Sequence, residues 1–169
     1  MKRLRDASTG GTEGAVYVEF LVAFMPVFFF FLCLVQLADL HQANLIVHHA
    51  VQVGVRAAAV VVPDDPQFYD QVQPGQLTGK KRDAVVKATS IPLRASRSIS
   101  EIKLTFPSSV GGNDDKTTYG RDDVINAKLQ AHFECRVPLV SHVVCDLQNG
   151  MRTLTANATM PNQGADYTY

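Results

Sequence analysis

The sequence predicts an α+β protein in which one long N-terminal helix packs against a small antiparallel β-sheet. Three observations support this fold class. An apolar segment over residues 15–38 leads into a helical pattern of apolar residues that continues to residue 62. Pro and Gly residues then interrupt the chain over 63–79. From about residue 100, apolar and polar residues alternate with a period of two, as in half-buried strands.

Whole-chain averages conceal how unevenly charge and hydrophobicity are distributed. The 169 residues include 16 Lys and Arg and 16 Asp and Glu, and the mean hydropathy is +0.01. This balance argues against a polybasic nucleic-acid-binding protein and against a charge-rich disordered tail. Lys2, Arg3 and Arg5 lie in a polar leader, however, whereas the apolar segment contains a single charged residue, Glu19. The chain is therefore a basic leader, an apolar segment and a polar domain.

Residues 15–38 are predicted to form a transmembrane helix. A helix rises about 1.5 Å per residue, so about 20 apolar residues cross the hydrocarbon layer of a bilayer. The segment contains Phe20, Phe24 and the run 28–31, which the rest of the chain is too small to cover as a core. The basic leader predicts a cytoplasmic N-terminus, with the chain beyond about residue 40 on the other side of the membrane.

A removable secretory signal is the main alternative for this segment. Such signals have an apolar region of about 7–15 residues, followed by a small-x-small cleavage site. Here the apolar run is longer, and Leu37-Ala38-Asp39 is a poor site. This alternative predicts cleavage near residue 38 and a soluble secreted protein or enzyme.

The helix is predicted to continue beyond the membrane, over residues 39–62, and to bend near Pro26. Pro63 and Pro66 provide its stop signal. One apolar stripe is expected to face a partner, and it consists of Leu40, Ala43, Val47, Val51, Gly54, Ala58 and Val61. The polar side is expected to contain His41, His48, Gln52 and Arg56.

Residues 63–99 are predicted to be a linker that contains a short helix over 80–90, ended by Pro92. Residues 100–169 are predicted to form a small antiparallel β domain. Three strands are expected from the alternation over 101–106, 125–137 and 153–160, with a polar loop over 107–123. The apolar stripe of the long helix is the natural cover for the apolar face of this sheet.

The most informative pattern lies where the leader meets the apolar segment. The leader ends in Gly14, the apolar segment begins at Ala15, and Glu19 is its fifth residue. A charged group within a membrane helix costs about 2.5 kcal/mol or more, which makes Glu19 a functional candidate. Near the end of the span this cost falls, so an interfacial Glu with no special role is the alternative. A protease that cuts between Gly14 and Ala15 would create a cationic α-amine about one helical turn from Glu19. The two charges would then neutralise each other, within one chain or between neighbours.

On these residues the chain resembles type IV prepilins, and specifically the TadE-like minor pseudopilins of bacterial Tad/Flp pilus systems. The resemblance rests on Gly14-Ala15, Glu19-Phe20, the interruption at Met25-Pro26, the helix through 54–58 and the closing strand 154–161. Flp major pilins are shorter and typically have Glu-Tyr where this chain has Glu19-Phe20. The resemblance implies cleavage after Gly14 by a prepilin peptidase. It further implies assembly with other pilins and pseudopilins by an inner-membrane platform and a cytoplasmic ATPase.

Cys135 and Cys145 are candidates for a disulfide, because the compartment beyond a bacterial inner membrane is oxidising. Two free thiols are the alternative. His132 and His142 each precede one of these cysteines by three residues, but a regular strand points His132 and Cys135 to opposite faces, which disfavours zinc. The aspartates at 114–115 and 122–123 lack EF-hand spacing, so a solvated loop is expected rather than a calcium site.

No catalytic motif, cofactor or metal site is predicted. The sequence contains no phosphate-binding Gly loop, no nucleophile elbow and no metalloprotease helix motif. The second functional hypothesis is a single-pass, membrane-anchored binding or sensor module with a periplasmic β domain. It differs from the pseudopilin hypothesis in predicting an uncut leader and no assembly defect when Glu19 is changed.

Overall fold

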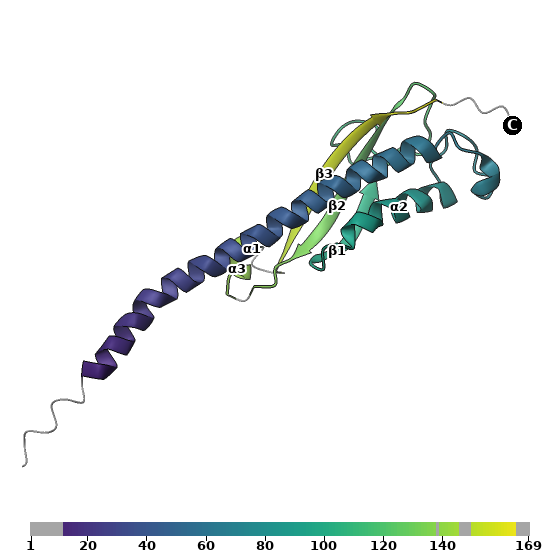
Figure 1. Ribbon diagram of the computed structural model, residues 1–169. Helices are drawn as coiled ribbons and strands as arrows, with labels where there is room; N and C mark the ends of the chain where they lie inside the picture. The colour runs from purple at the N-terminus through teal and green to yellow at the C-terminus, as the bar shows by residue number, and fades with distance from the viewer. Residues whose placement is uncertain (1–11, 138, 146–149, 165–169) are drawn as a thin grey trace, which may run out of the picture.

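The computed structural model, which describes residues 12–137, 139–145 and 150–164, confirms the α+β fold (Figure 1). A long helix, α1 (Thr12–Val61), extends well beyond a small domain that packs on its C-terminal half. The other elements are η1 (Pro66–Phe68), α2 (Gly79–Leu93), β1 (Ile99–Thr105), β2 (Val124–Glu134), α3 (Ser141–Val144) and β3 (Met151–Pro161). Residues 1–11 of the predicted leader, 1–14, lie outside the described residues, and its last three residues belong to the start of α1.

Helix α1 is continuous through Pro26, and Figure 1 shows it curving in its N-terminal half. A proline within a helix removes one backbone hydrogen bond and favours such curvature. The predicted polar side, with His41, His48, Gln52 and Arg56, is exposed. The apolar stripe is buried as predicted except at Val61, which is half-buried, because Val62 is the residue that turns into the core at the helix end.

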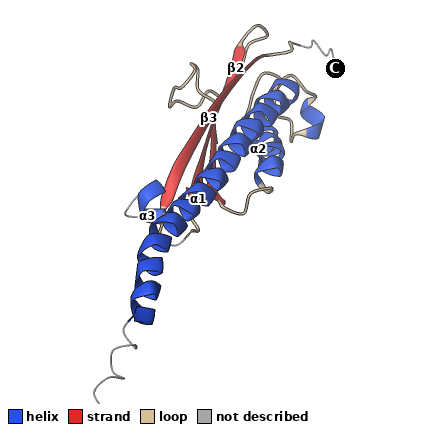
Figure 2. Cartoon of the chain, turned by 60° about the vertical axis from the view of Figure 1, so that its left-hand side comes forward, coloured by secondary structure: helices blue, strands red, loops and turns tan. Residues whose placement is uncertain are grey.

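The three strands form one antiparallel sheet in the order β1-β2-β3. Inward residues pair across it, as in Leu104 with Leu129 and Leu129 with Ala156. Helix α1 covers this face, and Figure 2 shows it running along β2 and β3. The predicted cover of the sheet is therefore confirmed.

The strand ends differ from those predicted. Strand β1 begins at Ile99, with an irregular register between Ser100 and Ile102. Strand β2 ends at Glu134, so the expected continuation to residue 137 is wrong. After Glu134, the backbone N–H of Cys135 donates a hydrogen bond to the carbonyl of Gly150. The chain then turns into the disulfide-linked segment.

Residues 63–99 are more than a linker. The side chains of Leu77, Val85 and Leu93 lie in the same core as the sheet and α1. The short helix also extends further than predicted, because α2 includes Pro92 and ends at Leu93. Helix α2 thus forms a second helix beside α1 rather than a connector.

Lys81 joins α2 to the end of α1, and the sequence did not reveal it. Its side chain is fully buried, and its ammonium donates hydrogen bonds to the carbonyls of Val62 and Asp64 at 3.0 Å each and of Gln73 at 3.4 Å. The Nζ atom also lies 5.7 Å from the ring centre of Tyr69. Carbonyls at a helix C-terminus lack intrahelical partners and attract cations, so Lys81 caps α1 from a second element.

Gly54 allows α1 and α2 to approach closely. A Cβ atom added at Gly54 would lie 2.5 Å from Oγ1 of Thr89, which itself donates a buried hydrogen bond to the carbonyl of Val85 at 2.8 Å. The gain in helix propensity from Gly to Ala is about 1 kcal/mol, whereas overpacking costs about 1–3 kcal/mol. The lack of space for a side chain between α1 and α2 therefore outweighs the higher helix propensity of Ala at this position.

We expect Gly54→Ala to lower the free energy of unfolding by about 1 kcal/mol, because the clash outweighs the gain in propensity. Thermal unfolding of the full chain in detergent micelles measures this change. A second substitution, Thr89→Ala, removes the clashing hydroxyl, so the double variant should recover most of the loss. A Gly54→Ala chain that is more stable than wild type would contradict the close contact.

Candidate functional site

The N-terminal half of α1 is an exposed apolar surface. From Gly14 to Phe31 every residue is exposed, including Phe20 at 61%, and no described part of the chain covers this segment. It is the one helix, within the described residues, that is long and apolar enough to cross a membrane. Exposed apolar surface of this extent marks contact with another apolar medium, either lipid or protein.

Aromatic side chains form a continuous row on this segment. The rings of Phe20 and Phe24 are stacked with centres 5.5 Å apart, and those of Phe24 and Phe28 are 5.6 Å apart. Residues four apart lie on one face of a helix, so the row follows from the sequence spacing. Phe20 therefore begins a surface that is suited to packing against lipid chains or neighbouring helices.

Glu19 lies within the exposed apolar segment. Its side chain is exposed, and it has no ion-pair partner in the part of the chain that the structure describes. Gly14 and Ala15 lie in the first turn of α1, about one helical turn before Glu19, and a Cβ at Gly14 would meet open space. The structure thus places the candidate cleavage residues and the candidate assembly residues together at one end of one helix. The cleavage itself remains a prediction.

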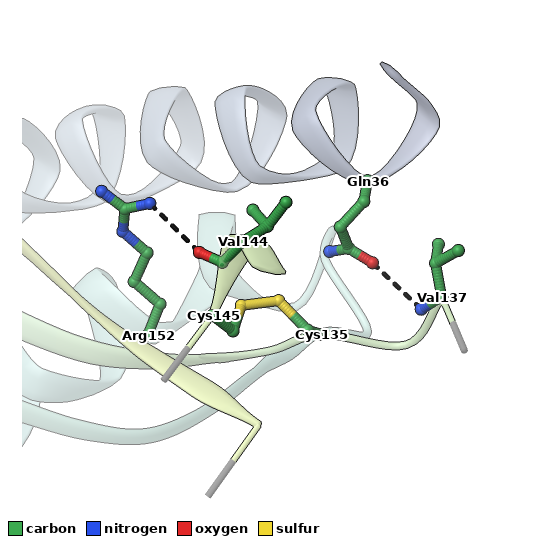
Figure 3. Close-up of a disulfide and its surroundings, with 6 residues drawn as sticks. All are labelled: Gln36, Cys135, Val137, Val144, Cys145 and Arg152. Carbon is green, nitrogen blue, oxygen red and sulfur yellow. Dashed lines mark hydrogen bonds between the residues drawn. A yellow bond between two sulfur atoms is a disulfide. The ribbon is translucent and has the colours of Figure 1, made fainter. Parts of the chain in front are cut away.

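Gln36 marks the junction between the exposed and the packed halves of α1. Its side chain is only 1% exposed, and its Oε1 accepts a hydrogen bond from the backbone N–H of Val137 at 3.0 Å (Figure 3). No periodic pattern in the sequence marks this residue. The available signal was that Gln36 is the one amide side chain in residues 15–38.

The segment that Gln36 contacts is closed by a disulfide. Cys135 and Cys145 are bonded, with their Cα atoms 6.4 Å apart, and Figure 3 shows the bond beside Gln36. Helix α3 lies within this loop. The side chains of Val140, which precedes α3, and of Val144 turn toward the core, and Val140 is fully buried. In the chain-entropy description, a short closed loop of this kind contributes about 2–3 kcal/mol to stability.

The same disulfide bears on zinc ligation by this segment. A cysteine binds zinc as a free thiolate, and the sulfur atoms of Cys135 and Cys145 are bonded to each other. His132 instead has its Nε2 3.9 Å from the Glu101 carboxylate and its Nδ1 3.3 Å from Thr153 Oγ1. No group of three or more metal-ligating side chains occurs among the described residues.

The aspartates of the 107–123 loop have structural partners. Asp115 forms an ion pair with Arg82 at 2.6 Å, and Asp123 forms one with Lys116 at 2.8 Å. The pKa of Asp123 is lowered by the hydrogen bond from Lys116, and that of Asp114 by hydrogen bonds from Ser108. These contacts tie the loop to α2 and to itself, and they engage oxygen atoms that a calcium ion would need.

Comparison of the chain with protein-family models, with curated proteins and with solved structures found no match.

Proposed function

We propose that this chain is a pilin-like structural subunit of a membrane-associated assembly, specifically a minor pseudopilin of a Tad-type pilus or secretion machine. The observation that carries the proposal is the division of α1 into two halves. One half packs a small β domain, and the other half is a wholly exposed apolar segment with a single carboxylate, Glu19, near its start. In this proposal the exposed half first lies in the bacterial inner membrane and then packs against other subunits.

The proposed topology has a cytoplasmic N-terminus and a periplasmic β domain. The basic leader and the oxidised pair Cys135–Cys145 both support it, since disulfides persist in oxidising compartments. The partners in this proposal are a prepilin peptidase, other pilins or pseudopilins, an assembly platform and the lipid bilayer. Nucleic acid is not among them, and no catalytic activity or cofactor is proposed.

The alternative of a membrane-anchored binding module has weaker support. A pocket of about 190 Å³ lies at the far end of the domain, between residues such as Tyr119, Arg121 and Asn162. Small-molecule sites usually measure about 300–1,000 Å³ and are mostly apolar. This pocket is smaller, whereas the exposed half of α1 provides a far larger surface for association.

Mass spectrometry of the N-terminus tests the proposal. The membrane form of the protein, isolated from cells that contain the matching prepilin peptidase, should begin at Ala15. A Gly14→Ala variant matched for expression should keep its leader if that peptidase makes the cut. An intact Met1 in the wild-type protein would favour the anchored module, and a start beyond residue 38 would indicate a secreted protein.

A further inference from the structure

We propose that the disulfide-closed loop is a second membrane contact, which rests on the outer leaflet of the bilayer and binds anionic phospholipid headgroups. This inference rests on the membrane span in the proposed function. Its apolar contact consists of Leu139 and Val143, and its basic contact consists of Arg136 and Arg152.

The loop lies level with the outer end of the predicted span along α1. From Ala15 to residue 35 the helix covers about 30 Å, the thickness of the hydrocarbon layer. Gln36, which accepts the hydrogen bond from the backbone N–H of Val137, lies in the last turn of the predicted span, 15–38, and so near the outer boundary of that layer. Figure 2 shows α3 at the end of the domain that lies nearest the exposed half of α1. The loop is thus placed at the depth of the headgroups.

The loop is apolar on two sides. Val140 and Val144 face the core, as residues four apart on one face do. Leu139 and Val143 face away from it and are 71% and 66% exposed. The side with Val140 and Val144 packs on the core. The opposite side, with Leu139 and Val143, contacts solvent unless an apolar medium covers it.

The backbone at Leu139 is in an unfavourable conformation. Its φ angle is 70°, in the left-handed region that branched side chains rarely adopt. Such a conformation is strained and persists only where surrounding contacts enforce it. Here the disulfide, the Gln36 hydrogen bond and the buried Val140 hold the loop on either side of Leu139.

Two arginines give this end of the domain its basic contact. Arg136 and Arg152 flank the loop, and both side chains are exposed. Their described hydrogen bonds are to backbone carbonyls, of Arg97 and of Val144 respectively, and neither contacts a carboxylate in the described ranges. A guanidinium has five N–H donors, so each keeps donors for a phosphate. Asp39 and Glu134 lie at the same end, so the contact depends on the placement of the arginines rather than on net charge.

The aspartates gather at the opposite end of the domain. Asp64, Asp65 and Asp70 follow the C-terminus of α1, and Asp115 pairs with Arg82 near the start of α2. Cations at that end, such as Lys80 and Arg82, are paired with aspartates, whereas Arg136 and Arg152 have no described carboxylate partner, so anionic headgroups would be attracted more strongly to the arginine-bearing end. The charge distribution therefore orients the domain in the same way as the helix does.

Single-tryptophan fluorescence tests the inference directly, because the chain contains no Trp. The full-length Val143→Trp variant is reconstituted in vesicles of phosphatidylcholine and phosphatidylglycerol whose acyl chains are brominated near the headgroup. We expect the bromines to reduce its emission about twofold or more, as for other side chains inserted at the interface. The control is Phe68→Trp, at a residue 75% exposed in η1 at the far end, whose emission should not change.

The basic contact is tested in the same vesicles. Omitting phosphatidylglycerol should weaken the quenching of Val143→Trp, and adding Arg136→Gln with Arg152→Gln should remove that dependence on phosphatidylglycerol. Replacing the two arginines by Lys should retain it. Changing both Cys135 and Cys145 to Ser should also reduce the quenching, because the loop then loses its closure. Leu139→Trp is a second probe of the same contact.

The outcomes separate this inference from the proposed function. Val27→Trp in α1 is measured in vesicles whose acyl chains are brominated near the bilayer centre, because Val27 lies close to the middle of the predicted span. If it is quenched and both loop probes stay unquenched and accessible to iodide, the loop contact is wrong and the span stands. Blue-shifted but unquenched emission from the loop probes would indicate a protein partner and would also overturn the lipid contact. If Val27→Trp is itself unquenched, the membrane span fails, and this inference fails with it.

Discussion

Changing Glu19 to Ala is expected to reduce incorporation of the processed chain into assemblies about 60- to 300-fold. Cleavage after Gly14 leaves an α-amine at Ala15, and without Glu19 that cation has no carboxylate on its own helix segment. An unpaired charge among apolar helices costs about 2.5–3.5 kcal/mol, and each 1.4 kcal/mol changes an equilibrium about tenfold. Glu19 is exposed in the single chain, so the stability of the folded domain should not change.

The readout is the amount of Ala15-starting chain in cross-linked oligomers and in material sheared from the cell surface. Asp39→Ala is the matched control, because Asp39 is an exposed carboxylate on the same helix beyond the apolar segment. That control should assemble normally. Normal assembly of Glu19→Ala, with normal processing, would argue for the membrane-anchored binding module instead.

Changing Lys81 to Met is expected to lower the free energy of unfolding by about 2–3 kcal/mol. Met keeps most of the apolar stem but cannot donate a hydrogen bond. The Val62 and Gln73 carbonyls also accept from the backbone N–H groups of Gly75 and Gln76, whereas the Asp64 carbonyl has no other donor in the described chain. Hydrogen bonds from a charged donor contribute about 1.5–3 kcal/mol, and the cap on α1 is lost as well.

Lys80→Met is the control for this prediction. Lys80 is the neighbouring lysine, and its ion pair with Asp70 lies on the surface, where the two side chains are 59% and 64% exposed. Exposed pairs contribute about 0–1 kcal/mol, so this variant should unfold almost as wild type does. Equal losses of stability in the two variants, measured by thermal unfolding, would contradict the capping role of Lys81.

The pH dependence gives a second readout for Lys81. Burial lowers the pKa of its ammonium, and the carboxylates of Asp64 and Asp65 partly oppose this effect. The unfolded chain therefore holds the proton more tightly than the folded chain. As pH rises from the folded pKa toward the ordinary lysine value of 10.5, this group should add to the stability of the wild-type chain. Lys81→Met should lack that increase.

The sequence was a good guide where the signal was local and periodic. The stripe from Leu40 to Ala58 repeats every three or four residues, and the alternation over 125–133 repeats every two, so each specifies one face of one element. The α+β fold and the cover of the sheet by α1 follow from those two faces. The errors lie at element ends, as at Pro92 and after Glu134, where tertiary contacts rather than periodicity decide whether a helix or strand continues.

The candidate site divides in the same way. Gly14, Ala15, Glu19 and Phe20 are recognisable from the sequence because they lie together in one helix and break its apolar pattern. Gln36 is also in that helix, but its partner, the backbone N–H of Val137, is 101 residues further along the chain. Contacts of that kind depend on the packing of distant elements and carry no local pattern.

By itself, the sequence determined that this chain has a long helix with an apolar first half, one carboxylate in that half and a β domain after it. These features arise from the composition and period of single segments. Only the tertiary structure decided that Lys81 caps α1, that α2 belongs to the core and that a disulfide-closed loop meets α1 at Gln36. Each of these depends on which distant segments are brought together when the apolar faces are buried, because burial has no preferred direction along the sequence.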